Sequence, residues 1–153
     1  MTRPRMRRAA SGAVALALAA VTALAGYAVA DAKHADASAA LGPGLVTVTV
    51  DIHYSHFSLS TLDVRTGTTV RFLIRNEDPI NHEFIVGDAR VHALHEHGTH
   101  PAHPPVPGEV SVPAGQLGET FYRFDQAGKV LFACHLPGHF AYGMRGWVDV
   151  TPA

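Results

Sequence analysis

The sequence predicts an all-β fold, a Greek-key β-sandwich that follows an N-terminal signal peptide, and three observations lead to it. Short segments of alternating apolar and polar residues, rich in Val, Ile, Phe and Thr, recur along the second two thirds of the chain. Gly and Pro residues separate these segments, as is typical of turns between strands. The length of 153 residues suits one such domain. Many short strands joined by such turns indicate a sandwich of two sheets.

The first 30 residues have the pattern of a secretory signal peptide. Four arginines between residues 3 and 8 precede an apolar run over residues 12–30, which ends in the small-residue triplet Ala28-Val29-Ala30. Cleavage is predicted before Asp31, and the alternative is an uncleaved membrane anchor, because the run is long enough to span a bilayer. Residues 31–44, rich in Ala, Asp and Gly, are predicted to form a flexible tether.

The domain is predicted to occupy residues 45–153, and its first strand is the alternating segment 45–52. A short second segment containing Phe57 and Leu59 is expected to continue this pattern. A turn is expected at Thr66-Gly67, and a second turn containing Pro79 is expected at residues 76–81. The remaining strands are predicted at residues 62–64, 69–75, 84–86, 109–112, 119–124, 129–133 and 146–150.

Residues 87–108 interrupt the strand pattern. A helix is possible over residues 89–97, but the prolines that follow require a loop. The segment 92–103 is rich in histidine, and its metal-binding side chains are His92, His95, Glu96, His97, His100 and His103. Such tracts bind metals in some proteins, so a second metal site, or copper uptake and delivery, stands beside the simpler interpretation of a solvated loop.

The net charge and the few sulfur-containing residues limit the classes of function that the chain can have. Removal of residues 1–30 leaves 8 basic residues, because 4 of the 12 are lost, and all 13 acidic ones, a net charge of −5 with histidine neutral. This balance, without a basic stripe, argues against nucleic acid as a partner. The chain has one cysteine, so it forms no internal disulfide. Cys134 and Met144 are then the only sulfur-containing residues of the mature chain.

Those two sulfur atoms belong to one evenly spaced motif. Cys134, His139 and Met144 are separated by four residues each, with Gly138 and Gly143 allowing the bends of a loop between two strands. A thiolate, two imidazoles and a weak axial thioether are the ligands of a trigonal copper site. The second imidazole must come from elsewhere, and the strand order favours His82.

The other candidates are less suitable ligands. His53 and His56 come too early in the strand order, and the alternation of side chains along a strand aims His135 away from its neighbour Cys134. The alternative for the whole motif is structural, with Cys134 and Met144 as core residues and His139 on a loop.

On this motif the chain resembles the cupredoxins, the small blue copper proteins related to plastocyanin and azurin, over roughly residues 44–151. The resemblance implies the same β-sandwich and one type 1 copper, with His82 at the position of the first ligand and Met144 as the axial ligand. It also implies that electrons leave through His139. A redox partner is accordingly expected to dock near His139 and Phe140.

The chain departs from the family at Glu83, where many members carry Asn or a small polar residue that braces the cysteine loop. We therefore consider three possible braces. Asn76 or Asn81 could take that role, or Glu83 itself could accept a hydrogen bond from a backbone N–H.

These features predict an exported electron carrier that cycles between Cu(II) and Cu(I), monomeric and secreted or periplasmic, attached to a membrane only if its N-terminal segment stays uncleaved. The main alternative is a copper chaperone or storage protein that uses the histidine-rich segment 92–103. An enzyme such as a copper oxidase or nitrite reductase is disfavoured. Those enzymes connect two copper centres through histidines that flank the cysteine, and here Ala133 precedes Cys134 while only His135 follows it.

Overall fold

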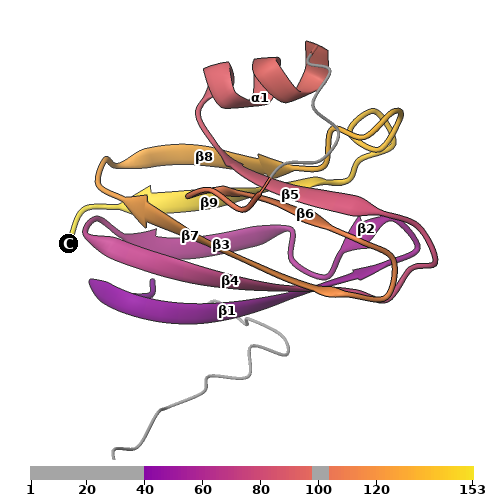
Figure 1. Ribbon diagram of the computed structural model, residues 1–153. Coiled ribbons are helices and arrows are strands. Elements are labelled where there is room, and N and C mark those ends of the chain that lie inside the picture. The colour runs from indigo at the N-terminus through magenta and orange to yellow at the C-terminus, as the bar shows by residue number, and fades with distance from the viewer. Residues whose placement is uncertain (1–39, 98–103) are drawn as a thin grey trace, which may run out of the picture.

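The computed structural model describes residues 40–97 and 104–153, which form two β-sheets packed face to face with one helix against the five-stranded sheet (Figure 1). The strand orders are β2-β1-β4-β7 and β3-β9-β8-β5-β6. The elements are β1 (Gly44–His53), β2 (His56–Phe57), β3 (Thr61–Arg65), β4 (Thr68–Asn76), β5 (His82–Gly87), α1 (Ala89–His97), β6 (Glu109–Val112), β7 (Leu117–Phe124), β8 (Gly128–Ala133) and β9 (Arg145–Thr151). The predicted all-β sandwich is therefore confirmed.

The sandwich forms because strand alternation sends one row of side chains inward. In β4 the residues Val70, Phe72 and Ile74 are fully buried, while the residues between them are at least partly exposed. β5 is buried along its whole length, which fits its position between β8 and β6 with α1 against it. β1 and β4 run parallel, as do β3 and β9, so long crossover connections join the two sheets.

Aromatic rings fill the space between the sheets. Phe84 lies 4.9 Å from Phe72, 5.4 Å from Phe57 and 5.4 Å from Phe132, measured between ring centroids. At the start of β9, Gly146 allows the Phe132 ring to approach, because a Cβ there would lie 2.2 Å from its Cζ and 2.6 Å from the Ser60 carbonyl oxygen. The ordered core therefore reaches the end of the sandwich where β8 ends and β9 begins.

The folded domain begins a few residues before the boundary at residue 45. Leu41 forms an isolated bridge with Val64, donating its N–H to the Asp63 carbonyl at 2.9 Å and accepting from the Arg65 N–H at 2.8 Å. The signal peptide predicted at residues 1–30, and the tether as far as residue 39, lie outside the described residues. In the part of the chain that is described, no helix has the length and apolar character needed to cross a bilayer.

Strand register places the candidate ligands at one end of the sandwich. β5 pairs antiparallel with β8 through Ile85 and Ala133, so the start of β5 lies beside the segment that follows β8. β8 pairs with β9 through Ala133 and Arg145, so the loop of residues 134–144 is closed by two adjacent strands. His82, the first residue of β5, therefore faces this loop.

Candidate metal centre

The loop between β8 and β9 is held by its own backbone. The Cys134 N–H donates to the Met144 carbonyl at 3.1 Å, and the Met144 N–H donates to the His139 carbonyl at 3.0 Å. Gly143 has a φ of 96°, a conformation that L-residues rarely adopt, at the turn just before Met144. These bonds fix the positions of Cys134, His139 and Met144 relative to one another before any metal binds.

Three of the four residues singled out by the sequence bring their ligand atoms together. The Nδ1 atoms of His82 and His139 lie 3.2 Å apart, and Cys134 Sγ lies 3.2 Å from His139 Nδ1. The three atoms all lie within 4.8 Å of one another. His82 and Cys134 are buried and His139 is half-buried, so the cluster lies just below the surface of the loop.

Met144 lies at the same end of the sandwich. Its side chain is 1% exposed and belongs to the hydrophobic core together with Cys134. Its carbonyl oxygen is the acceptor for the Cys134 N–H. The Met144 thioether is therefore buried in an apolar environment at the point where the loop between β8 and β9 closes.

Asp78 positions His82, and the sequence analysis missed it. Its Oδ2 lies 2.8 Å from His82 Nε2. The same carboxylate accepts 2.7 Å hydrogen bonds from the backbone N–H groups of Tyr54 and Ser55, which both have positive φ angles. Burial raises the pKa of Asp78, but these two N–H groups and the His82 ring outweigh it and hold the pKa below its usual value. An ionised Asp78 only accepts, so His82 Nε2 carries the proton and Nδ1 presents a lone pair to the cluster.

Glu83 braces the cysteine loop. Its Oε1 accepts a 2.7 Å hydrogen bond from the His135 N–H, and its side chain is only 4% exposed. Asn76 instead donates to the carbonyls of Ile80, Val112 and Pro113, which ties the turn before His82 to the neighbouring segment. Of the three braces considered from the sequence, Glu83 is therefore the one bonded to the segment that carries Cys134.

The environment favours a neutral thiol until a metal binds. Burial raises the pKa of Cys134 to about 11, against the opposing effect of backbone N–H groups of Glu83 and Leu136 and with a further increase from the Glu83 charge. Burial also lowers the pKa of His139, and the neighbouring His82 lowers it further. Two imidazoles and a thiol form a donor set that suits copper, and binding of the metal releases the thiol proton.

We expect the metal-free protein to lose stability at alkaline pH. The Cys134 pKa is higher in the folded state, about 11, than in an unfolded chain, about 9, so the unfolded chain releases its proton first. The stabilisation that comes from the protonated, buried thiol is fully present below pH 9 and is lost as the pH rises through 11. Between pH 8 and 10.5 the loss is about 2 kcal/mol, measurable by urea denaturation with a chelator and a reductant present.

Cys134→Ala is the control for this effect, because it removes the titrating group. The free energy of unfolding of this variant is lower at every pH, but the part of its decrease with pH that comes from the thiol disappears. If the free energy of unfolding falls equally with pH in the two proteins, the buried thiol does not titrate as described.

The other histidines considered as ligands lie elsewhere. His53 has a 56% exposed side chain near Glu77, and His56 is exposed with its Nδ1 2.7 Å from the Tyr54 carbonyl. His135 points away from the cluster, with its Nδ1 2.7 Å from Glu96 Oε2. Among the described residues, the cluster of His82, Cys134 and His139 is the only group of three such ligand atoms.

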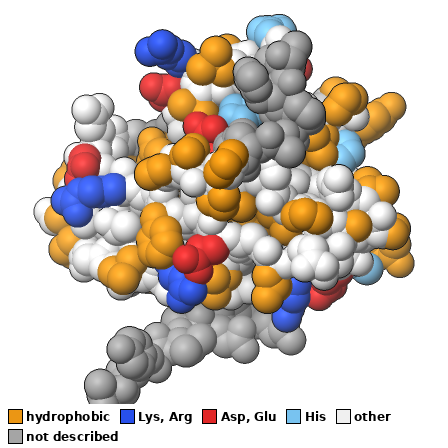
Figure 2. Space-filling model, in the orientation of Figure 1, with side chains coloured by type: hydrophobic (Ala, Val, Ile, Leu, Met, Phe, Trp, Pro, Cys, Tyr) orange, Lys and Arg blue, Asp and Glu red, His pale blue; other side chains and the backbone are white. Residues whose placement is uncertain are grey.

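Part of the histidine-rich segment 92–103 is helical. His92, His95 and His97 lie on α1, with His92 buried and His97 exposed, whereas His100 and His103 lie outside the described residues. Figure 2 shows histidine side chains at the surface on the α1 side of the molecule. The helix considered over residues 89–97 is therefore present, and the described part of the segment is not a plain solvated loop.

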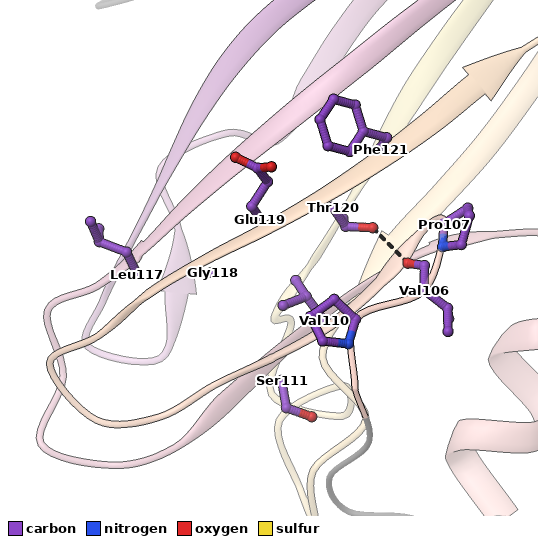
Figure 3. A pocket seen from close by; sticks show the side chains of 10 residues that line it. Val106, Pro107, Val110, Ser111, Leu117, Gly118, Glu119, Thr120 and Phe121 are labelled. Atoms are coloured by element: carbon purple, nitrogen blue, oxygen red, sulfur yellow. Dashed lines mark hydrogen bonds between the residues drawn. The ribbon is translucent and has the colours of Figure 1, made fainter.

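A groove at the edge formed by β6 and β7 contains none of these residues (Figure 3). Thr120 donates its hydroxyl to the Val106 carbonyl at 2.8 Å on its floor. The lining consists of Pro105, Val106, Pro107, Val110, Ser111, Leu117, Gly118, Glu119, Thr120 and Phe121. Its mostly apolar wall offers no cluster of metal-binding side chains.

The chain is similar to known copper proteins. A family model described as copper binding proteins of the plastocyanin/azurin family matches residues 45–151. The copper-resistant cuproprotein CopI of Rubrivivax gelatinosus is 41% identical over 97 residues, which are 61% of this chain and 59% of that protein. CopI of Pseudomonas aeruginosa is 30% identical over 129 residues, which are 63% of this chain and 71% of that protein.

Among solved structures, auracyanin B superimposes with a TM-score of 0.58 at 24% identity, covering 74% of this chain and 94% of that one. At this identity the likeness concerns the fold alone. The chain spans less than two thirds of the length of the Rubrivivax relative.

Proposed function

Because this chain belongs to the plastocyanin/azurin family of copper-binding proteins, we propose that it is an exported one-electron carrier whose single type 1 copper cycles between Cu(II) and Cu(I). The observation that supports this most directly is the preformed cluster of Cys134 Sγ, His82 Nδ1 and His139 Nδ1. In this proposal those three atoms are the equatorial ligands and Met144 is the axial ligand. The protein is non-enzymatic, with no substrate converted at the site.

When bound, copper supplies a one-electron redox couple, and the protein determines how much its ligands must move between the two oxidation states. Imidazole suits both oxidation states and sulfur favours Cu(I), so neither state is excluded. The ligand loop is fixed by backbone hydrogen bonds, and Asp78 and Glu83 fix His82 and the cysteine segment from behind. Little movement is then required between the two oxidation states, which suits fast electron exchange.

The test of the carrier function is the rate of electron self-exchange between the Cu(I) and Cu(II) forms of the loaded protein, measured by NMR line broadening. A carrier gives rapid exchange together with an intense visible charge-transfer band. A protein that shows the band but exchanges electrons very slowly would contradict the carrier function while leaving the copper site intact.

Met144→Leu is expected to retain copper and raise the reduction potential. A weak axial sulfur tunes the metal more than it holds it, and its loss favours the Cu(I) state. We expect less than a tenfold loss of Cu(II) affinity, below about 1.4 kcal/mol. Protein-film voltammetry and a competitive copper titration measure the two quantities, and complete loss of copper would show that Met144 is a primary ligand.

A redox partner is proposed to dock on the loop surface near His139 and Phe140. Tyr142 on this loop is 85% exposed, and Figure 2 shows hydrophobic side chains projecting at the upper right, where Figure 1 shows the loop between β8 and β9. Phe140 is half-buried, stacked on His135 and covered by the Arg145 guanidinium. A small apolar surface suits the brief, weak encounters of an electron shuttle.

Tyr142→Glu is expected to slow self-exchange about tenfold, since a contact tyrosine contributes roughly 1–2 kcal/mol to such an encounter. The optical spectrum remains unchanged because Tyr142 is exposed. Leu45→Glu is the matched control: Leu45 is also exposed and pairs with Thr69 near the start of β4, at the opposite end of the sandwich. Equal rates in both variants and the unaltered protein would mean that electrons leave by another face.

A second candidate function is copper sequestration or delivery, favoured by the copper-resistance names of the relatives and by the histidines of α1. Such a protein gives up its copper to a competing apo-protein faster than it exchanges electrons. In either case we propose an extracytoplasmic location, supported by the signal-peptide pattern of residues 1–30. Membrane attachment applies only if that segment stays uncleaved, and the protein acts as a monomer.

A further inference from the structure

Two histidine rings face each other beside the copper cluster without belonging to it. His92 lies on the inner side of α1 and is 6% exposed, and the His135 side chain is 2% exposed on the segment after β8. His92 Nδ1 and His135 Nε2 lie 2.8 Å apart. The contact joins α1 to the residue next to Cys134, although 43 residues separate the two histidines in sequence.

The outer nitrogens of both rings are committed as donors. His92 Nε2 lies 3.1 Å from the Leu131 carbonyl oxygen, which only accepts, so this nitrogen carries a proton. His135 Nδ1 lies 2.7 Å from the Glu96 carboxylate, which places a proton on that nitrogen as well. With the outer nitrogens protonated, the two inner nitrogens face each other at 2.8 Å as the remaining positions for a shared cation.

Such a pair requires a cation between its lone pairs, either a proton or a metal ion. Metal-binding histidines commonly donate their second nitrogen to a carboxylate or a carbonyl. Both rings have this arrangement, and it repeats that of His82, which Asp78 holds while its Nδ1 lies 3.2 Å from His139 Nδ1.

The number of ligands limits which metal fits. Among the described residues, no third His, Cys, Asp or Glu brings a ligand atom within 4.8 Å of both facing nitrogens, since the only such group of three is that of the first site. Zn²⁺ almost always takes four ligands. Imidazole also binds copper, and Cu(I), a d¹⁰ ion, accepts linear coordination between two ligands. With metal–nitrogen bonds of about 2.0 Å, binding of the metal requires the two nitrogens to move apart by about 1 Å from their 2.8 Å separation.

We propose that His92 Nδ1 and His135 Nε2 are the ligands of a second metal ion, Cu(I), bound between α1 and the segment that follows β8. Glu96 and the Leu131 carbonyl orient the two rings from behind. This site is distinct from the type 1 centre, although the peptide bond between Cys134 and His135 connects a ligand of each. The protein then holds two copper ions per chain, which adds a copper-binding capacity to the proposed electron carrier.

The first experiment counts Cu(I) ions, supplied anaerobically to the copper-free protein in competition with bathocuproine disulfonate. His92→Phe is expected to bind one equivalent fewer than the unaltered protein. His97→Phe is the matched control, since His97 is exposed on the same helix, and it is expected to lose none. The charge-transfer band of the Cu(II)-loaded His92→Phe protein verifies that the first site still folds. Equal Cu(I) counts in a folded His92→Phe protein overturn the proposal.

The second experiment needs no substitution. Ag(I), which shares the charge and closed d shell of Cu(I), is titrated into the ¹⁵N-histidine-labelled protein, and the imidazole nitrogens are followed by NMR. Coordination shifts at His92 Nδ1 and His135 Nε2 are expected. If these nitrogens shift with pH but not with Ag(I), they share a proton and the proposal fails. This result is separate from the carrier function, whose failure appears as slow self-exchange.

Discussion

Cys134→Ser is expected to abolish the visible charge-transfer band of the copper-loaded protein and to lower its Cu(II) affinity at least a hundredfold. The band requires a thiolate bonded to copper, and the chain has no other cysteine to replace it. A tightly held metal gains about 10–16 kcal/mol from four ligands, so loss of the strongest one costs 3 kcal/mol or more, a factor of about 100 or more. Optical titration with Cu(II) measures both effects.

The control for this prediction is His53→Ala. His53 is another residue weighed as a ligand, but its side chain is 56% exposed and it is not part of the cluster. This variant is expected to keep both the band and the affinity. A Cys134→Ser protein that keeps its colour would remove the type 1 assignment altogether, whatever the control shows.

The strands were predictable because burial on one face imposes a two-residue period on the sequence. The segment predicted at residues 69–75 is β4 (Thr68–Asn76), and that at residues 129–133 is β8 (Gly128–Ala133). The pairing of β1 with β4 in parallel was not predictable, because it depends on contacts between strands that are distant in sequence. The two-residue strand β2 is too short to carry a period.

The candidate site was likewise predictable from the sequence only in part. Even spacing singled out Cys134 and His139, and strand order singled out His82, and the structure brings these three together. Asp78 could not be assigned from the sequence, because its role depends on backbone N–H groups 23 and 24 residues earlier in the chain. The pairing of His135 with α1 depends on how that helix packs, which local spacing does not encode.

Asp78→Ala is expected to weaken Cu(II) binding by about 10- to 100-fold, the usual effect of losing the carboxylate behind a metal-binding histidine. Without Asp78 the His82 ring loses the acceptor that fixes its tautomer and orientation. The N–H groups of Tyr54 and Ser55 also lose their acceptor, which costs about 1–3 kcal/mol in the free energy of unfolding. Competitive copper titration and urea denaturation measure the two effects.

Two further variants separate positioning from general destabilisation. Asp78→Asn keeps one oxygen acceptor at the same place, so its copper affinity is expected to lie between those of Asp78→Ala and the unaltered protein. Asp63→Ala removes an exposed carboxylate from β3 and is expected to change neither quantity. A folded Asp78→Ala protein with unchanged copper affinity would contradict the positioning role of Asp78. It would show that binding to a metal held by His139 and Cys134 is enough to orient the His82 ring without the carboxylate behind it.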